Sequence, residues 1–447
     1  MLLFFKSLDQ LVLFLGLVMP EHYTLPRSRV IELSGNHLLN PFSDKRESGS
    51  LYRASQGTID EVSKLATQGI DVKLLDTAPK YALDPATQQD VDLAVDSLSD
   101  IPDAAKILFN PTLHPTGNVW FQLTKRAIAL HTLYNIGDIR TLGDGIDPEV
   151  FEYPLFDGLS AFQILSDKDG EVKAKATLEK YKRFIDTPIE DGTGYYPSSK
   201  DFLMGVVDSQ AVQTRVSAAI NAAERHVLEN YRQNSGKEIV CASLACGSAG
   251  PIFEMSKRLE RIGIKTGKLI LVDSDPMALA SAYSLAGTVG VMDKIEIQKS
   301  NILTTDLREV VNPNSVDIVD LLGIFEYIPT TFKLHGISHP AAETFLKNVL
   351  EIVKPGGLIV MGNMLVERPQ QNFFKKVWPR LFQRSISEVL RIIDNSGLDS
   401  TETSITIPAR EGVYAIYAIK KGKVKENSYD DSHNRNLSRL ALNRLTY

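Results

Sequence analysis

Hydrophobic positions change their spacing along the chain, and the change divides it near residue 200. After that point, short apolar runs alternate with stretches in which apolar residues recur every three to four positions, which predicts alternating strands and helices. The predicted strands are Glu238–Ala245, Lys268–Asp273, Lys294–Lys299, Val316–Leu322 and Leu358–Asn363. The predicted helices run from about Ile252 to Ile262, Pro276 to Ala286 and Ala341 to Val353. The alternation predicts an α/β fold with a doubly wound, Rossmann-like parallel sheet.

Two further patterns flank this alternation. The stretch "DSQAVQTRVSAAINAAERHVLENYRQNSG" has helical spacing and ends at Gly236, a residue type common after helices. At the other end, "TSITIPAREGVYAIYAIKK" holds two β-rich runs separated by a turn. We therefore expect an antiparallel β-hairpin to close the sheet.

The first 200 residues have weaker patterns. The segment from Thr58 to Gly69 predicts a helix and the segment from Ile70 to Asp76 predicts a strand, so we expect an α/β or α+β accessory domain. The segment "GTGYYPSSK", from Gly192 to Lys200, is typical of a linker. We predict an N-terminal extension at 1–25, the accessory domain at 26–200, the Rossmann-like domain at 201–422 and a polar tail at 423–447.

Composition narrows the function classes. Of 447 residues, 43% are hydrophobic, which is enough for a folded core, and the net charge of −6 gives no broad reason to bind nucleic acid. The apolar run from Leu11 to Met19 is shorter than the roughly 20 residues that span a bilayer, so we expect no membrane span. Secretion remains an alternative reading of this segment, although no A-x-A-like cleavage site follows it. The two cysteines, Cys241 and Cys246, form neither a disulfide framework nor a metal motif, which favours a cytoplasmic protein.

The first predicted strand ends in very small residues. In "VCASLACGSAGPIFEM" the run from Ala245 to Gly250 leads directly into a helix. Small residues let a ligand approach the backbone, and the amide groups that begin the helix favour polar or anionic atoms. Close packing of helix on sheet is the alternative. Cys246 has no nearby histidine, so we interpret it as a packing residue rather than a nucleophile.

The following strands also end in residues suited to a ligand. Asp273 ends the second strand, where a carboxylate can accept hydrogen bonds from ribose hydroxyls, while Asp275 suits a helix cap. Asn301 follows the third strand and can bond an adenine edge or form a turn. Leu322 and Gly323 follow the fourth strand. Since parallel strands share one carboxyl edge, these features predict a single site.

With these motifs the chain resembles the class I S-adenosylmethionine (SAM)-dependent methyltransferases. The resemblance covers roughly residues 205–421, through "SLACGSAG", "LVDSDPMAL", "KSNIL", "VDIVDLLGIFEYI", "VKPGGLIVMGN" and the closing hairpin. It implies SAM as cofactor, with Asp273 on the ribose and Asn301 and Ile302 beside the adenine. The cofactor-binding residues that it implies are Ala245, Gly247, Ser248, Ala249, Asp273, Ser274, Asn301, Ile302, Leu322 and Gly323.

A finer resemblance and several departures accompany this one. "GIFEYIP", "GNM" and "WPRLFQRSISEVL" are similar to a bacterial subgroup that includes a fatty-acid methyl ester synthase. However, Ser243 stands where the family usually has an acid, Ala245 and Ala249 stand where glycine is commoner, and Asn301 stands where Asp is commoner. The missing acid puts contacts to the methionine end of the cofactor in question.

Methyl transfer depends strongly on positioning and desolvation, so no catalytic residue need be visible in the sequence. The candidates are Glu326 and Tyr327, just beyond the fourth strand, and His339 in the loop that follows. His335 lies in the same loop. A carboxylate or imidazole there could take a proton from a hydroxyl or amine, although a surface or structural role is the alternative.

The N-terminal half has its own faint resemblance. "SGSLYRASQGTIDEVSKLATQGIDVKLLD" is similar to the opening strand–helix–strand of tyrosine-phosphatase-like domains. No cysteine precedes Cys241, so catalysis by a cysteine thiolate is excluded there. The segment could instead cover the pocket and select a substrate.

These observations predict a cytoplasmic enzyme that transfers a methyl group in line from SAM to a small-molecule acceptor. Two alternatives remain open at this point. One is a non-catalytic cofactor-binding or scaffold protein, suggested by Ser243. The other is a nucleotide-dependent oxidoreductase, which the absence of G-x-G-x-x-G disfavours.

Overall fold

The structure is a computed structural model of the whole chain. It describes residues 29–31, 54–76, 88–99, 207–231, 237–274, 276–334, 337–377 and 381–422. The predicted N-terminal extension, linker and polar tail lie outside these residues.

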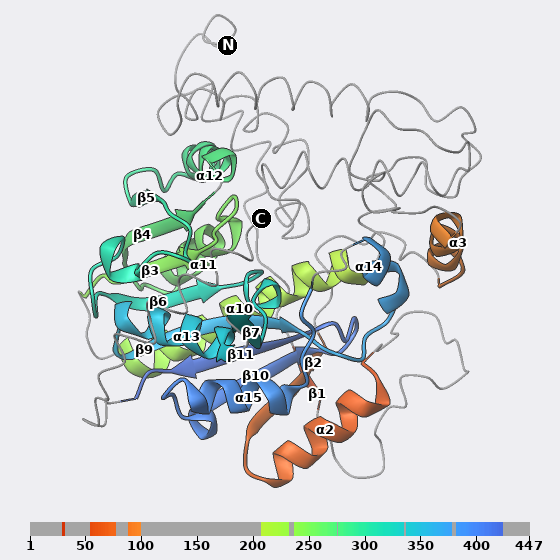
Figure 1. The fold of residues 1–447 in the computed structure, drawn as a ribbon. Coiled ribbons are helices and arrows are strands. Elements are labelled where there is room, and N and C mark those ends of the chain that lie inside the picture. The colour runs from red at the N-terminus through yellow and green to blue at the C-terminus, as the bar shows by residue number, and fades with distance from the viewer. Residues whose placement is uncertain are drawn as a thin grey trace, which may run out of the picture.

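One nine-stranded sheet organises the described residues (Figure 1). Its order is β1-β2-β10-β11-β9-β6-β3-β4-β5. The strands are β1 (Arg29–Ile31), β2 (Asp71–Asp76), β3 (Ile239–Leu244), β4 (Thr266–Asp273), β5 (Ile295–Lys299), β6 (Val316–Leu321), β9 (Val353–Met364), β10 (Thr403–Pro408) and β11 (Tyr414–Lys420). Strands β9, β6, β3, β4 and β5 are parallel, whereas β11 runs antiparallel to both β9 and β10. The five predicted strands and the antiparallel hairpin are therefore confirmed, but the hairpin does not close the sheet, because β2 and β1 lie beyond β10.

Helices cover both faces of the sheet, as the doubly wound prediction requires. Neighbouring residues of a strand face opposite sides: in β4, Leu269 and Leu271 pack in one core with α10, α11 and α12, while Ile270 and Val272 pack in the other with α13 and α15. The helices are α2 (Gln56–Thr67), α3 (Gln88–Ser99), α10 (Val207–Tyr231), α11 (Gly250–Arg261), α12 (Pro276–Val289), α13 (Ala341–Ile352), α14 (Gln371–Val377) and α15 (Ile386–Asn395). The three predicted helices are confirmed within a few residues.

The N-terminal elements join the same sheet. Strand β2 lies parallel to β10, with Leu74 opposite Ile407, and β1 pairs antiparallel with β2. The Glu61 carboxylate of α2 accepts hydrogen bonds from the backbone N–H of Ser387 at 2.9 Å and from its hydroxyl at 2.7 Å, at the start of α15. The described part of the predicted accessory domain therefore continues the C-terminal sheet. The domain boundaries themselves stay a prediction.

A small second sheet follows β6. Strands β7 (Thr331–Leu334) and β8 (Ile337–Pro340) pair antiparallel, with Phe332 opposite His339. The prediction of a loop around His339 is therefore wrong. These two strands are hard to predict from sequence, because each has only four residues and neither contains a long apolar run. His335 lies between the two strands, outside the described residues.

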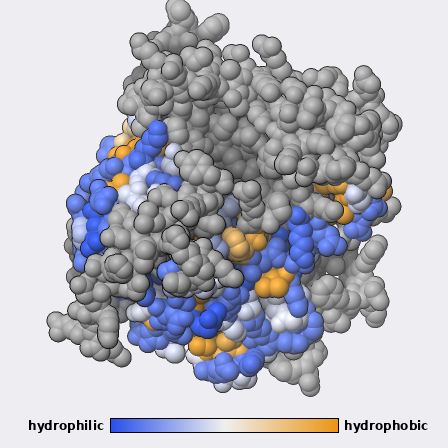
Figure 2. Space-filling view, viewed as in Figure 1, coloured by the Kyte–Doolittle hydropathy of each residue, from blue (hydrophilic) through white to orange (hydrophobic). Residues whose placement is uncertain are grey.

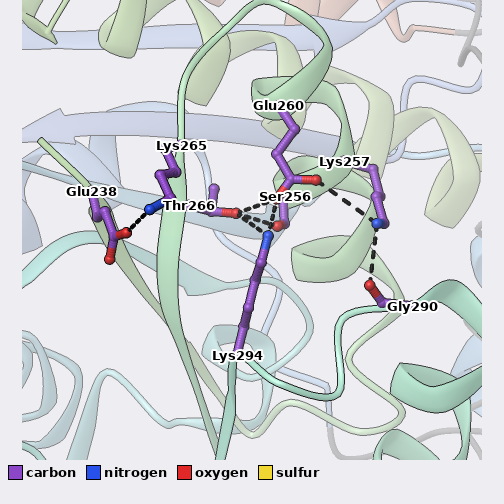
Figure 3. Close-up of polar contacts among 8 residues, drawn as sticks. All are labelled: Glu238, Ser256, Lys257, Glu260, Lys265, Thr266, Gly290 and Lys294. Carbon is purple, nitrogen blue, oxygen red and sulfur yellow. Dashed lines mark hydrogen bonds and ion pairs between the residues drawn. The ribbon is translucent and has the colours of Figure 1, made fainter. Parts of the chain in front are cut away.

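Polar contacts tie the elements together near the amino ends of the strands. Figure 3 shows the Lys294 ammonium, just before β5, pointing at the Glu260 carboxylate of α11. The hydroxyls of Ser256 and Thr266, both buried, are 2.6 Å apart beside this pair. These contacts fix α11 at the edge opposite to the predicted site.

A buried carboxylate makes a similar connection at the start of β6. Asp317 accepts hydrogen bonds from the Tyr231 hydroxyl at 2.8 Å, the Val240 N–H at 2.9 Å and the Lys354 ammonium at 2.5 Å. Burial, followed by this carboxylate, raises the pKa of Tyr231 above its usual value. Asp317 thus joins α10, β3 and β9 at one point.

The described surface is mostly hydrophilic on the face shown in Figure 2, where apolar residues form small separate patches. Within the described ranges, no helix combines the length and apolar character needed to cross a bilayer. The same ranges contain no group of three or more His, Cys, Asp or Glu side chains arranged to hold a metal ion.

Candidate functional site

The predicted residues gather where the chain reverses direction across the sheet. From β3 the chain passes outward to β4 and β5, then returns to place β6 on the other side of β3. In open α/β sheets, ligands bind at the carboxyl ends of the strands beside such a switch point. The segments after β3 and β6 therefore form the two sides of the candidate site.

The turn after β3 has a left-handed backbone at alternate positions. Ala245, Gly247 and Ala249 have φ angles of 54°, 54° and 61°. For alanine this conformation costs roughly 1–2 kcal/mol, so the turn stores strain that a simple connection would not need. The side chain of Ser248 is buried between them. The Cys246 thiol donates to the Gly247 carbonyl at 3.4 Å and is buried, in keeping with a packing role.

Asp273 faces this turn from the end of the neighbouring strand. Its Oδ2 accepts a hydrogen bond from the Gly247 N–H at 2.9 Å. The carboxylate thus lies between β3 and β4 at their carboxyl ends, where the ribose assignment places it. Ser274 follows and is exposed. Asp275, the predicted helix cap, lies outside the described residues.

The third strand end favours a structural role for its side chains. The amide oxygen of Asn301 accepts from the Leu303 N–H at 3.0 Å, which closes a turn on Asn301 itself. Ile302 is buried in the core on the α13 side of the sheet. The turn-forming alternative for Asn301 is therefore present in the structure, and adenine contacts from these two residues stay predictions.

The strand β6 brings an acid that the sequence analysis did not consider. Asp320 lies beside Ser243, whose hydroxyl donates to Asp320 Oδ2 at 3.1 Å, and its Oδ1 accepts from the Leu322 N–H at 2.8 Å. Gly323 follows with a left-handed φ of 91°. Although Ser243 replaces the usual acid on β3, a buried carboxylate is thus present one strand away. No spacing within one strand could reveal this, because the two residues meet only through pairing of β3 with β6.

Glu326 lies beyond β6 in the short helix η2 (Phe325–Tyr327). It is 2% exposed, and its Oε1 lies 3.4 Å from Nη1 of Arg215, which comes from α10 and is 1% exposed. The Arg215 guanidinium also stacks over the Tyr414 ring, 4.6 Å from its centroid. The structure therefore pairs the predicted base with an arginine that sequence reasoning missed. The available signal was one charged residue among the small and apolar residues of "RVSAAINAA".

The other two catalytic candidates have different surroundings. Tyr327 is 41% exposed, at the surface beside Glu326. His339 lies in β8 of the small sheet and is half-buried. A joint catalytic role of Glu326, Tyr327 and His339 therefore stays a prediction.

Arg384 fixes the backbone that carries Glu326. This buried guanidinium donates to the carbonyl oxygens of Phe325, at 3.2 Å, and Ile328, on both sides of Glu326. It also donates to the Asn363 side-chain oxygen at 3.1 Å. The Phe382 N–H adds a hydrogen bond to the Glu326 carbonyl at 2.7 Å. The carbonyl groups of the turn that carries Glu326 therefore accept hydrogen bonds from Arg384 and Phe382, which lie between α14 and α15.

Comparisons with known proteins give only distant likenesses. No family model matches the chain, and no curated protein matches its sequence. A possible exported protein from Bordetella parapertussis has 16% identity and a TM-score of 0.41, covering 75% of this chain and 96% of that one.

Two further solved structures are similar at the same level. The CMeT domain of citrinin polyketide synthase has 15% identity and a TM-score of 0.39, over 57% of this chain and 63% of that one. The magnesium protoporphyrin IX methyltransferase from Synechocystis PCC 6803 has 10% identity and a TM-score of 0.34, over 47% and 87%. Likenesses this weak carry no argument about function, and the comparisons give the phosphatase-like resemblance no support. The fold rests on the sheet order of the chain itself.

Proposed function

We propose that this chain is a SAM-dependent methyltransferase acting on a small-molecule acceptor. The observation that carries the proposal is the hydrogen bond from the Gly247 N–H to the Asp273 carboxylate at the switch point of the sheet. It brings a left-handed turn of small residues and an acid from the next strand to one edge, as the methyltransferase-like motifs require.

The residues present suit SAM. The turn from Ala245 to Ala249 offers backbone without large side chains, and the Asp273 carboxylate can accept hydrogen bonds from two ribose hydroxyls. At the methionine end, the buried Asp320 carboxylate lies next to Ser243, the position on β3 where the family usually has an acid. When bound, SAM would supply an electrophilic methyl group. The protein would align the acceptor with it and exclude water.

A cofactor-binding protein without turnover is the second candidate. Glu326 is held in a buried ion pair, which favours this candidate because a paired carboxylate has a structural use without catalysis. It shares the SAM site with the main proposal and differs only in the transfer step.

Calorimetric titration of the full chain with SAM, S-adenosylhomocysteine and NAD tests the proposal. We expect binding of the two methionine-derived ligands in the micromolar range and none of NAD. Binding of NAD alone would overturn the proposal. Incubation with methyl-labelled SAM and a small-molecule extract then separates the candidates, since only the methyltransferase transfers label.

A further inference from the structure

Arg215 and Glu326 each leave one buried polar atom without a partner. Beside their contact at 3.4 Å, Arg215 Nε and Glu326 Oε2 have no hydrogen-bond partner among the described residues. Both side chains are almost completely buried. An unsatisfied buried polar group destabilises the folded protein, so a donor and an acceptor left open on the same ion pair require an explanation.

The pair lies beside the predicted cofactor contacts. A Cβ placed on Gly362 of β9 would meet Arg215 Cδ at 3.2 Å and Leu322 Cδ2 at 3.5 Å. Leu322 and Gly323, the predicted cofactor contacts, follow β6, and Glu326 comes three residues after Gly323. The absence of a side chain at Gly362 therefore lets the arginine reach the carboxyl edge of the sheet, next to the proposed SAM site.

We propose that Arg215 Nε and Glu326 Oε2 together bind a hydroxyl group, which makes the chain an O-methyltransferase of alcohols or phenols. This inference rests on the proposed function and names its acceptor. A hydroxyl donates its hydrogen to Glu326 Oε2 and accepts from Arg215 Nε through one lone pair. Its second lone pair remains for attack on the methyl group.

Other acceptors fit this pair less well. An amine has a single lone pair, so it cannot accept from Arg215 and attack at the same time. A carboxylate has no hydrogen to donate and would place a second negative charge against Glu326. The pair therefore selects a neutral oxygen nucleophile.

The transfer step balances with these two residues alone. The hydroxyl oxygen forms a bond to the methyl carbon supplied by SAM, and the carbon–sulfur bond breaks with its electron pair going to sulfur. The hydroxyl proton passes to Glu326 Oε2 and leaves to solvent after release of the methyl ether. In this step Arg215 binds the acceptor oxygen through Nε and holds Glu326 through Nη1, and Glu326 is the base.

The surroundings indicate an apolar acceptor. Tyr327, the last residue of η2, and Phe382, in the segment before α15, are both 41% exposed. The Phe382 N–H bonds the Glu326 carbonyl, and Tyr327 is the next residue in the chain. Exposed apolar side chains near a buried polar pair are suited to the body of an apolar molecule.

Matched model acceptors test the inference. The full chain is incubated with methyl-labelled SAM and, separately, 4-butylphenol, 4-butylaniline and 4-butylbenzoic acid, while SAM affinity is measured by calorimetry. We expect label in a base-stable methyl ether of 4-butylphenol. Transfer mainly to the aniline or benzoate, or to none of the three while SAM binds, would overturn the hydroxyl assignment and leave the cofactor assignment intact. Failure of SAM to bind would remove both.

Variants separate a catalytic role from a structural one. Glu326→Gln should lower the rate with 4-butylphenol by about 10²–10⁴-fold. With 4-nitrophenol, which is ionised at pH 8 and is therefore repelled by Glu326 in the wild type, the loss should be less than about tenfold, because this phenolate needs no base and meets a neutral side chain in the variant. Arg215→Lys should raise KM for both phenols. Glu411→Gln is the control, since Glu411 is equally buried and accepts from Thr214, the residue before Arg215. Equal losses with both phenols in Glu326→Gln would show a structural role only.

Discussion

Replacement of Asp273 tests the candidate site most directly. Its carboxylate makes a hydrogen bond to the Gly247 N–H at 2.9 Å, and in the proposed complex it also accepts from the ribose. Asp273→Ala removes both interactions. Loss of charge-assisted hydrogen bonds to a bound hydroxyl pair should cost about 1–3 kcal/mol, which weakens S-adenosylhomocysteine binding about 5- to 150-fold.

The free protein should change less. The Gly247 N–H is half-buried, so water can replace part of the lost bond, and we expect Asp273→Ala to lower the free energy of unfolding by about 1 kcal/mol. Asp273→Asn keeps one side-chain oxygen facing Gly247 and should fall between wild type and Asp273→Ala in affinity. Calorimetry gives the dissociation constants, and urea unfolding gives the stability.

A control and a clear contrary result complete this test. Glu296→Gln, on β5, removes a carboxylate paired with Lys268 at the surface and should change neither affinity nor stability by more than about 0.5 kcal/mol. If folded Asp273→Ala binds S-adenosylhomocysteine as tightly as wild type does, Asp273 is not a ribose ligand and the proposed function loses its main support.

Three further predictions concern stability. Burial lowers the pKa of His226 to about 4, so the unfolded chain takes up a proton on this imidazole at a higher pH than the folded chain does. Stability therefore falls as pH decreases from about 6.5 to 4. His226→Gln should remove up to about 3 kcal/mol of that loss, measured by unfolding at a series of pH values. Burial raises the pKa of the Asp208 carboxyl to about 6, although the Arg368 charge opposes this shift, so protonation of Asp208 increases stability as pH falls below 6. If the slope of stability against pH does not flatten in His226→Gln, the assignment of that slope to His226 is wrong. Asp317→Asn should destabilise by about 2–3 kcal/mol in urea, because three donors lose a charged partner; a loss under 0.5 kcal/mol would contradict this. Ala245→Gly should be neutral or stabilising by up to about 1 kcal/mol in thermal unfolding, since φ is 54° there, whereas a loss of 1 kcal/mol or more would show that the turn is unstrained.

The sequence predicted the sheet because its evidence is local. Four of the five parallel strands are runs of mostly buried residues next to a helix, and β5 is half-buried with alternating apolar positions. This pattern needs no knowledge of distant contacts. Strand β2 was also visible as a strand. Its partner was not, because pairing with β10 joins residues more than 300 positions apart.

In the candidate site, too, the residues in local patterns were predicted and those that meet only through packing were missed. Asp273 and the turn at Gly247 were predicted because each belongs to a strand end with a recognisable pattern. Arg215 was missed, since it comes from the middle of α10 and meets Glu326 only through packing. Asp320 was missed for a similar reason, because its relation to Ser243 depends on the register of two strands.

The addition of β1 and β2 to the sheet has a consequence for the handling of this protein. Strand β10 is buried along most of its length, and β2 satisfies the backbone groups on its outer side. A shortened chain beginning at Val207 would expose this ladder as an open apolar edge, ready to pair with another copy. We therefore expect β1 and β2 to protect the β10 edge from pairing with another copy of the chain.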